Sequence, residues 1–170
     1  MKKIIFSLLL LIFGLSVYAQ QAECIQECRN DIQQLVQKVD SLEHQLTYLN
    51  LCYELDILHL NIQDSTNEIY SHSQSLQMNV VAHYYRKKEL DSKTEYYQSF
   101  KYNYIKKQEL FDALKEFYMV SKIANKFSDS EIRLLNMRIQ LIENDFDVLK
   151  SNMYLFKTAI EGYADLINNR

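Results

Sequence analysis

Proline is absent from this chain of 170 residues, and glycine occurs only at Gly14 and Gly162. Tight β-hairpin turns depend on residues that tolerate a positive φ or have φ preset, so a β-rich fold would have to build every turn without them. Long helices joined by few connections need almost none of these residues. The sequence therefore predicts an all-α fold.

The N-terminus has the three parts of a secretory signal peptide. Two lysines follow Met1, residues 4–13 are almost entirely apolar, and Val17 and Ala19 stand three and one before a cleavage site. This pattern predicts a signal peptide over residues 1–19, a mature protein that starts at Gln20, and export to the periplasm or secretion. An uncleaved anchor is the alternative, although the apolar run is short against the about 20 residues of a spanning helix.

The charge of the chain is modestly acidic. The net charge is −3, and loss of the two signal-peptide lysines makes it −5. A surface of this sign does not attract a phosphate backbone. We therefore expect no nucleic acid among the partners.

A heptad repeat is predicted within a first helix over about residues 22–62. Its a positions are Ile25, Ile32, Val39 and Leu46, and its d positions are Cys28, Leu35, Leu42 and Leu49. We call these eight residues the N-terminal seam. β-Branched residues at a with leucine at d favour a parallel two-stranded coiled coil. Burial against later helices of the same chain is the other arrangement, and we expect it to be the principal contact.

The chain has three cysteines, Cys24, Cys28 and Cys52. An odd number leaves at least one thiol free or paired between chains in an exported protein. Cys28 would meet its copy across the axis of a parallel dimer, which makes it the candidate for an interchain disulfide. The acid before Cys24 does not fit a lipoprotein signal.

The middle of the chain is less regular. Residues 63–91 are rich in Asn, Gln, Ser and His and are expected to be a polar helical or broken segment. A break is most expected at residues 64–67, where each side chain competes for backbone groups, and a continuous solvated helix is the alternative. A second helix is predicted over residues 92–127. Its expected apolar stripe is Leu110, Ala113 or Leu114, Phe117, Val120, Ala124 and Phe127.

A third helix is predicted over residues 129–168. With Ser128 as N-cap, Glu131 stands at N3, as in a capping box. Eleven apolar residues then alternate in steps of three and four from Ile132 to Ile167, and a second row at the c positions adds Leu134, Leu141, Val148 and Leu155. So wide an apolar face should contact two neighbours. The whole pattern predicts one elongated antiparallel helical bundle or coiled coil of about three long helices, over residues 20–170.

Basic and aromatic residues are interleaved between Tyr84 and Lys107. Such a segment can lie on anionic headgroups, which would give a weak membrane contact. The alternative is that the tyrosines cap the core while lysine stems lie over it. The candidate interaction surface consists of Tyr84, Tyr85, Arg86, Lys87, Lys88, Tyr96, Tyr97, Lys101, Tyr104, Lys106 and Lys107.

No motif for catalysis or metal binding stands out. Asp56 with His59 and Glu68 with His72 can each share a helix face, but the Glu-x-x-His motif of a di-metal bundle is absent from the sequence. There is no nucleophile motif and no glycine-rich phosphate loop. We therefore expect neither an enzyme nor a cofactor or metal site.

Three function classes remain, of which an enzyme or metal carrier is the one that the sequence supports least. The first is a structural or adaptor protein of the cell envelope, whose heptads bind a second copy or another helical envelope protein. The alternative is a periplasmic holdase-type chaperone that uses a cleft between helices lined by Tyr and Phe. The sequence favours the first.

Overall fold

The computed structural model describes the backbone of residues 2–82 and 86–169 and the side chains of residues 24–82 and 86–169. It contains three helices, α1 (Lys2–Val81), α2 (Lys87–Ile123) and α3 (Asp129–Asn168), and no strand in these ranges. The predicted all-α helical bundle is confirmed. The chain divides into two compact units, residues 1–46 and 47–170. The side chains of the expected signal peptide, residues 1–19, lie outside the described ones.

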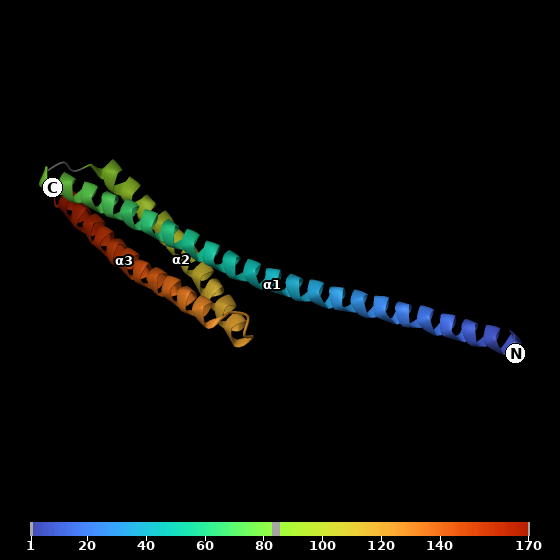
Figure 1. Cartoon of the computed structure of the whole chain (residues 1–170). Helices are drawn as coiled ribbons and strands as arrows, with labels where there is room; N and C mark the ends of the chain where they lie inside the picture. Colours follow the sequence, from blue (N-terminus) through green and yellow to red (C-terminus); the bar gives the residue numbers. More distant parts are fainter. Residues whose placement is uncertain (1, 83–85, 170) are drawn as a thin grey trace. The chain divides into compact units, whose positions relative to one another are not determined.

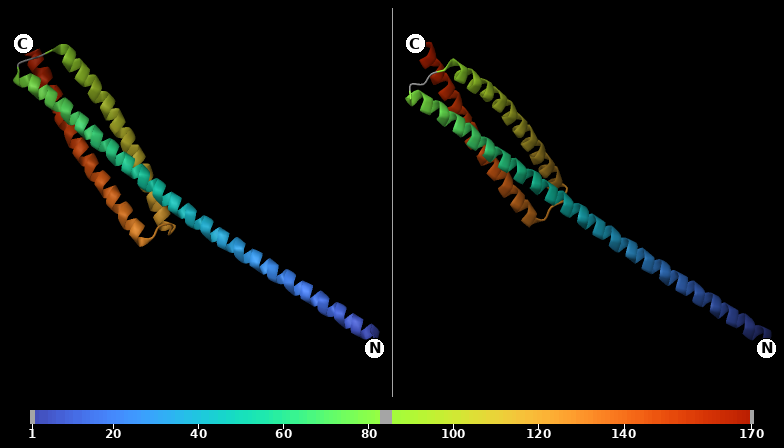
Figure 2. Two further views of the ribbon diagram at one scale, coloured as in Figure 1. Left: turned by 45° about the horizontal axis from the view of Figure 1, so that its top comes forward. Right: turned by 90° about the horizontal axis from the view of Figure 1, so that it is seen from above.

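The second unit is a bundle of three helices that lie side by side (Figures 1 and 2). Residues 47–81 of α1, the whole of α2 and the whole of α3 each contribute buried side chains to one core. Aromatic rings from α2 and α3 contact each other in this core: the ring centroid of Phe146 lies 5.6 Å from that of Phe111 and 5.7 Å from that of Tyr104. Aromatic contacts therefore hold α2 against α3 at mid-bundle.

Helix α1 continues through the polar part of the sequence. The hydroxyl of Ser65 donates to the carbonyl of Asn61 at 2.8 Å, and that of Thr66 donates to the carbonyl of Ile62 at 2.8 Å. These side chains therefore bond within the helix and do not compete with it. The break expected at residues 64–67 does not occur. The alternative of a continuous helix is the one found: Ser65, Ile69, Ser73 and Leu76 form a single buried row, and most of the other side chains between residues 63 and 79 are exposed.

Helix α2 ends at a turn that contains no glycine. Asn125 adopts a φ of 53°. The backbone N–H of Asn125 donates to the carbonyl of Lys122 at 3.0 Å, and the backbone N–H of Lys126 donates to the carbonyl of Ser121 at 2.9 Å. This is the Schellman arrangement, with asparagine in the left-handed position that glycine usually occupies. The helix consequently ends before Phe127, which is buried beyond it.

The buried face of α2 differs from the predicted stripe. Leu110, Phe117 and Val120 are exposed, whereas the next residue in each case, Phe111, Tyr118 and Ser121, is buried. Apolar and aromatic residues occur on more than one side of this helix, so periodicity alone selected the wrong residue at these three positions, whereas Leu114 and Phe127 of the predicted stripe do contact the core. The error is one residue, or about 100° around the helix.

Helix α3 begins with the expected capping box. The backbone N–H of Ser128 donates to Glu131 Oε2 at 2.8 Å, and the backbone N–H of Glu131 donates to Ser128 Oγ at 3.4 Å. The alternating row forms the buried face: Leu135, Ile139, Ile142, Phe146, Leu149, Met153, Phe156, Ile160 and Tyr163.

The second apolar row of α3 is not covered. Leu134, Leu141, Val148 and Leu155 are between 45% and 53% exposed. Helix α3 contacts both neighbours, because Asn136 accepts a hydrogen bond from Tyr118 of α2 at 2.8 Å and Arg138 donates to Asp56 of α1 at 2.8 Å. The expected contact of α3 with two neighbours is therefore confirmed, and the row at the c positions stays exposed beside these contacts.

Candidate functional site

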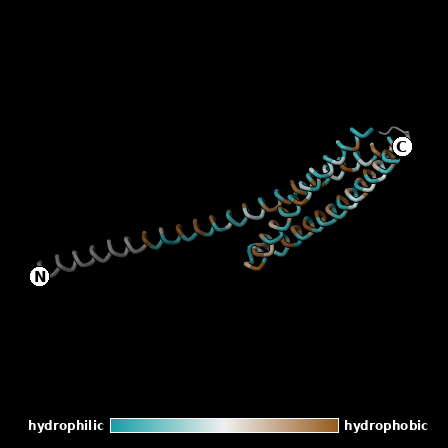
Figure 3. Tube along the Cα trace, turned by 180° about the vertical axis from the view of Figure 1, so that it is seen from behind, coloured by the Kyte–Doolittle hydropathy of each residue, from teal (hydrophilic) through white to brown (hydrophobic). Residues whose placement is uncertain are grey.

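The N-terminal seam is exposed in the first unit. Its large apolar residues from Ile25 to Leu46 are between 57% and 69% exposed, and Cys28 is exposed as well. Figure 3 shows apolar residues returning turn after turn along this part of α1. Val36, at a flanking e position, adds a further exposed apolar side chain. A regular apolar row of this length on a helix surface is typical of an interaction site.

Within the second unit, α1 has two apolar rows. Leu49, Tyr53 and Leu60 continue the register of the seam and are between 58% and 62% exposed. The buried row consists of Leu51, Leu55, Leu58 and Ile62, each at most 3% exposed. At 100° per residue the two rows lie roughly half a turn apart on the helix.

Within the second unit, the bundle therefore packs the face of α1 opposite to Leu49. At this position the expectation that the later helices of the same chain would cover the seam is not met, and the seam residues of the first unit are exposed within that unit. The signal for this was in the sequence: Leu55, Leu58 and Ile62 follow a shifted row after Leu49.

The basic and aromatic segment is divided by the structure. Tyr96, Tyr97 and Tyr104 are half-buried against the core; Tyr97 contacts Phe156 edge-on, with ring centroids 6.0 Å apart. Arg86 precedes α2, and Lys107 lies between α2 and α1. The exposed members are Arg86, Lys87, Lys88, Lys101 and Lys106. Tyr84 and Tyr85 lie outside the described residues.

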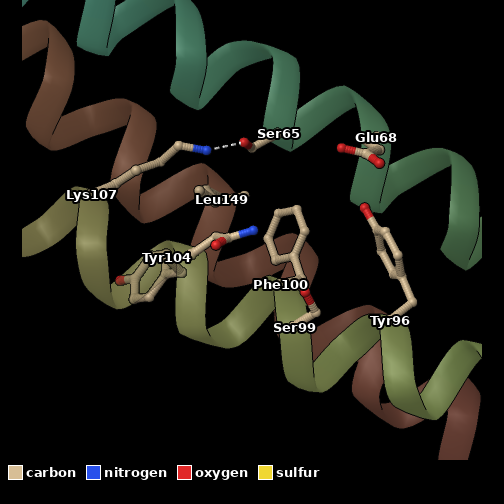
Figure 4. Close-up of a pocket in the computed structure, with 9 residues that line it drawn as sticks. Ser65, Glu68, Tyr96, Ser99, Phe100, Tyr104, Lys107 and Leu149 are labelled. Atoms are coloured by element: carbon tan, nitrogen blue, oxygen red, sulfur yellow. Dashed lines mark hydrogen bonds between the residues drawn. The ribbon is translucent and has the colours of Figure 1, made fainter.

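A small polar cavity of about 160 Å³ lies between α1 and α2 (Figure 4). In it the ammonium group of Lys107 donates to Ser65 Oγ. Burial lowers the pKa of Lys107, and the carboxylates of Glu68 and Asp64 partly oppose this shift. The cavity has room for a few water molecules. It is lined by Ser65, Glu68, Tyr96, Ser99, Phe100, Asn103, Tyr104, Lys107 and Leu149.

The hydroxyl of Tyr96 points toward Glu68 in this cavity (Figure 4). That oxygen is buried and has no partner of hydrogen-bond geometry among the described residues. Burial raises the pKa of Tyr96 well above its usual range, and the Glu68 carboxylate raises it further. The sequence did not predict this cavity, because residues of α1 and α2 that are about 30 positions apart form it.

The pairs that were considered for metal binding contact other helices. Asp56 pairs with Arg138, and the ring of His59 contacts the carboxylate of Asp145. His72 stacks on Tyr96 with ring centroids 4.0 Å apart, and its Nδ1 lies 2.8 Å from Lys93 Nζ. Among the described residues, no three His, Cys, Asp or Glu side chains gather into a possible metal site.

Burial and the neighbouring Lys93 ammonium lower the pKa of His72, and Glu68 opposes them. A positive imidazole is disfavoured at this position because it would lie beside a lysine and partly out of water. The site therefore favours neutral His72.

Among the described residues, no helix contains a stretch both long and apolar enough to cross a bilayer. Comparisons of the chain with models of known protein families, with curated proteins and with solved structures find no match.

Proposed function

We propose that this protein is an exported structural or adaptor protein of the cell envelope that acts through helix–helix association of its N-terminal seam. The observation that supports this is the arrangement of α1, which buries one apolar row in the bundle and leaves the other exposed. Full burial of a leucine-sized side chain favours association by about 1.5–3 kcal/mol, before the entropic cost of binding. Eight successive a and d positions, which correspond to about four heptads, are enough for a coiled coil.

The location is proposed from the N-terminal sequence. The charged start, the apolar run and the small residues before Gln20 are the three parts of a secretory signal peptide, and the small residues are those that a signal peptidase reads. A weak contact with anionic lipid through Lys87, Lys88, Lys101 and Lys106 is a secondary proposal, since these lysines are exposed.

Nucleic acid is not proposed as a partner, because the net charge of the chain is negative and would repel a phosphate backbone.

The holdase alternative is less favoured by the contacts of the described residues, although an apolar pocket does lie between α1 and α3. Phe100, Phe111, Phe146 and Phe156 are buried in the core. A client-binding cleft would require such rings to line an open surface. The cavity between α1 and α2 is instead lined mainly by polar side chains.

Site-specific photocrosslinking in the intact envelope tests the proposed function. A photoreactive amino acid replaces Val36, which flanks the seam, or Gln37, which occupies the outer f position. We expect crosslinked species from position 36 that disappear when Ile32→Lys places a charge in the seam. Position 37 is the matched control and should give little product. Equal crosslinking from both positions, or none from position 36, would count against the proposal.

A further inference from the structure

We infer that the partner of the N-terminal seam is a second copy of this chain, aligned parallel and in register. This inference rests on the proposed role of the seam in helix–helix association, and it specifies the occupant. Three features of α1 support it: the residue types in the seam, the charges on its flanks and the point at which the seam ends.

The residue types in the seam match one class of coiled coil. Three of the four a positions are β-branched, Ile25, Ile32 and Val39, and the d positions after Cys28 are all leucine. In a parallel pair each a residue meets its own copy, and the packing of β-branched a residues with leucine at d favours two strands over three or four. The seam is therefore complementary to itself in this alignment.

The flanking charges distinguish the two directions of pairing. In a parallel pair the g position of one helix meets the next e position of the other, so Lys38 meets Glu43 on both sides. In the antiparallel alignment that keeps all eight layers, Arg29 meets Glu43, but Lys38 of each copy faces Lys38 of the other. Like charges in contact disfavour pairing. The parallel alignment lacks such a contact among its g–e pairs.

The end of the seam is also marked. The exposed row continues past Leu49 to Tyr53, and the next d position is Asp56. The carboxylate of Asp56 accepts a hydrogen bond from Arg138 Nε at 2.8 Å and thus belongs to the bundle. A paired coil from Ile25 to Tyr53 would leave every buried residue of the bundle in place, since the core of the bundle uses the opposite face of α1.

Disulfide trapping at Cys28 tests whether the two copies are in register. The purified protein carries Cys24→Ser, and Cys52 stays because it is buried in the bundle. Oxidised glutathione takes two electrons and two protons from the two Cys28 thiols and leaves as two reduced glutathione molecules. We expect a covalent dimer on a non-reducing gel that is lost in Cys28→Ser.

A second cysteine position tests the direction. In the Cys24→Ser, Cys28→Ser background, Leu46→Cys should also give a covalent dimer, because position 46 meets its copy only in the parallel alignment. Asn30→Cys in the same background is the matched control on the outer f position and should stay monomeric. If Leu46→Cys forms a dimer only when Cys28 is present, with a 28–46 crosslink, the pairing is antiparallel and the inference is overturned.

Analytical ultracentrifugation of the protein without any crosslink tests whether the chain self-associates through the seam. We expect a dimer that Ile32→Lys weakens by at least about tenfold in Kd and that Gln33→Lys, with the same charge at an outer b position, leaves unchanged. Circular dichroism checks that both variants remain helical. A monomer at micromolar concentrations with no Cys28 dimer overturns self-association. If seam-dependent photocrosslinks from position 36 persist in that case, the proposed function stands with a different helical partner; without them both fail.

Discussion

The backbone N–H of Arg86, directly before α2, donates a 2.8 Å hydrogen bond to the hydroxyl of Tyr163 near the end of α3. The side chain of Tyr163 is fully buried. A helix start leaves its first N–H groups without partners in the helix, and no side-chain cap is present at Arg86. Tyr163 therefore holds the start of α2 against the end of α3.

Tyr163→Phe should lower the free energy of unfolding by about 0.5–1.5 kcal/mol, because it removes this hydrogen bond and keeps the ring. Urea denaturation followed by circular dichroism measures the loss. Tyr154→Phe, at an exposed tyrosine of the same helix, is the control and should change stability little. Equal effects of the two substitutions would show that the bond to Arg86 contributes nothing.

Tyr96→Phe, in contrast to Tyr163→Phe, should leave the free energy of unfolding unchanged or raise it. The Tyr96 hydroxyl is buried without a hydrogen-bond partner among the described residues. Removing an unsatisfied buried polar group relieves a desolvation cost, so the free energy of unfolding should stay the same or rise by up to about 1 kcal/mol. The same denaturation experiment measures it. A loss comparable to that of Tyr163→Phe would mean that Glu68 accepts a hydrogen bond from Tyr96.

Leu149→Ala should lower the free energy of unfolding by about 2–5 kcal/mol, since the side chain is 0% exposed and its loss opens a cavity. Leu141→Ala makes the same chemical change in the same helix at a side chain that is 51% exposed. Its effect should remain within about 0.5 kcal/mol. Similar losses for both would contradict the assignment of the buried face of α3.

The free energy of unfolding should decrease as the pH falls, and His72 should contribute to this decrease. Burial first, and Lys93 second, lower its pKa in the folded state, and Glu68 and the stacked Tyr96 are the other groups that face it. The unfolded chain therefore binds a proton more readily. This contribution is complete above the unfolded pKa of about 6.5 and is lost as the pH falls below it.

His72→Gln should reduce this pH dependence. The quantity to measure is the change in the free energy of unfolding between about pH 7.5 and about pH 5 for both proteins. Wild type should lose more stability than the variant over this interval. Identical changes in the two proteins would rule out His72 as a contributor.

The exported protein should begin at Gln20, because Val17 and Ala19 suit the signal peptidase. Mass spectrometry of the intact purified protein measures the N-terminus. Ala19→Arg places a large charged residue directly before the cut and should leave the precursor uncleaved. Wild-type protein that retains Met1, or that carries a lipid on Cys24, would contradict both the cleavage site and the proposed location.

Local features of the sequence determined the fold class and the whole of α3. The lack of proline and the near absence of glycine disfavour the many tight hairpin turns of a β-rich fold, and Ser128 with Glu131 marks a helix start by contacts only three residues apart. The buried row of α3 also follows from its spacing. Interactions within a few turns of one helix are enough for these conclusions.

Tertiary structure decided which face of α1 and of α2 is buried. Both helices carry apolar residues on two sides, as shown by Leu49 opposite Leu51 and by Leu110 beside Phe111. The choice depends on the neighbours that share the core, which local periodicity does not contain. Because Ser65 is small and occupies a core position, Lys107 of α2 can reach α1 and donate to its hydroxyl. No sequence pattern predicted that contact.

The N-terminal seam combines both kinds of information. Its spacing and residue types were evident from the sequence, including the preference for a parallel pair. Its availability was not, because a heptad row serves equally well within one chain or between two. Only the packing of Leu55, Leu58 and Ile62 into the bundle shows that, within the second unit, the core lies on the face of α1 opposite to Leu49.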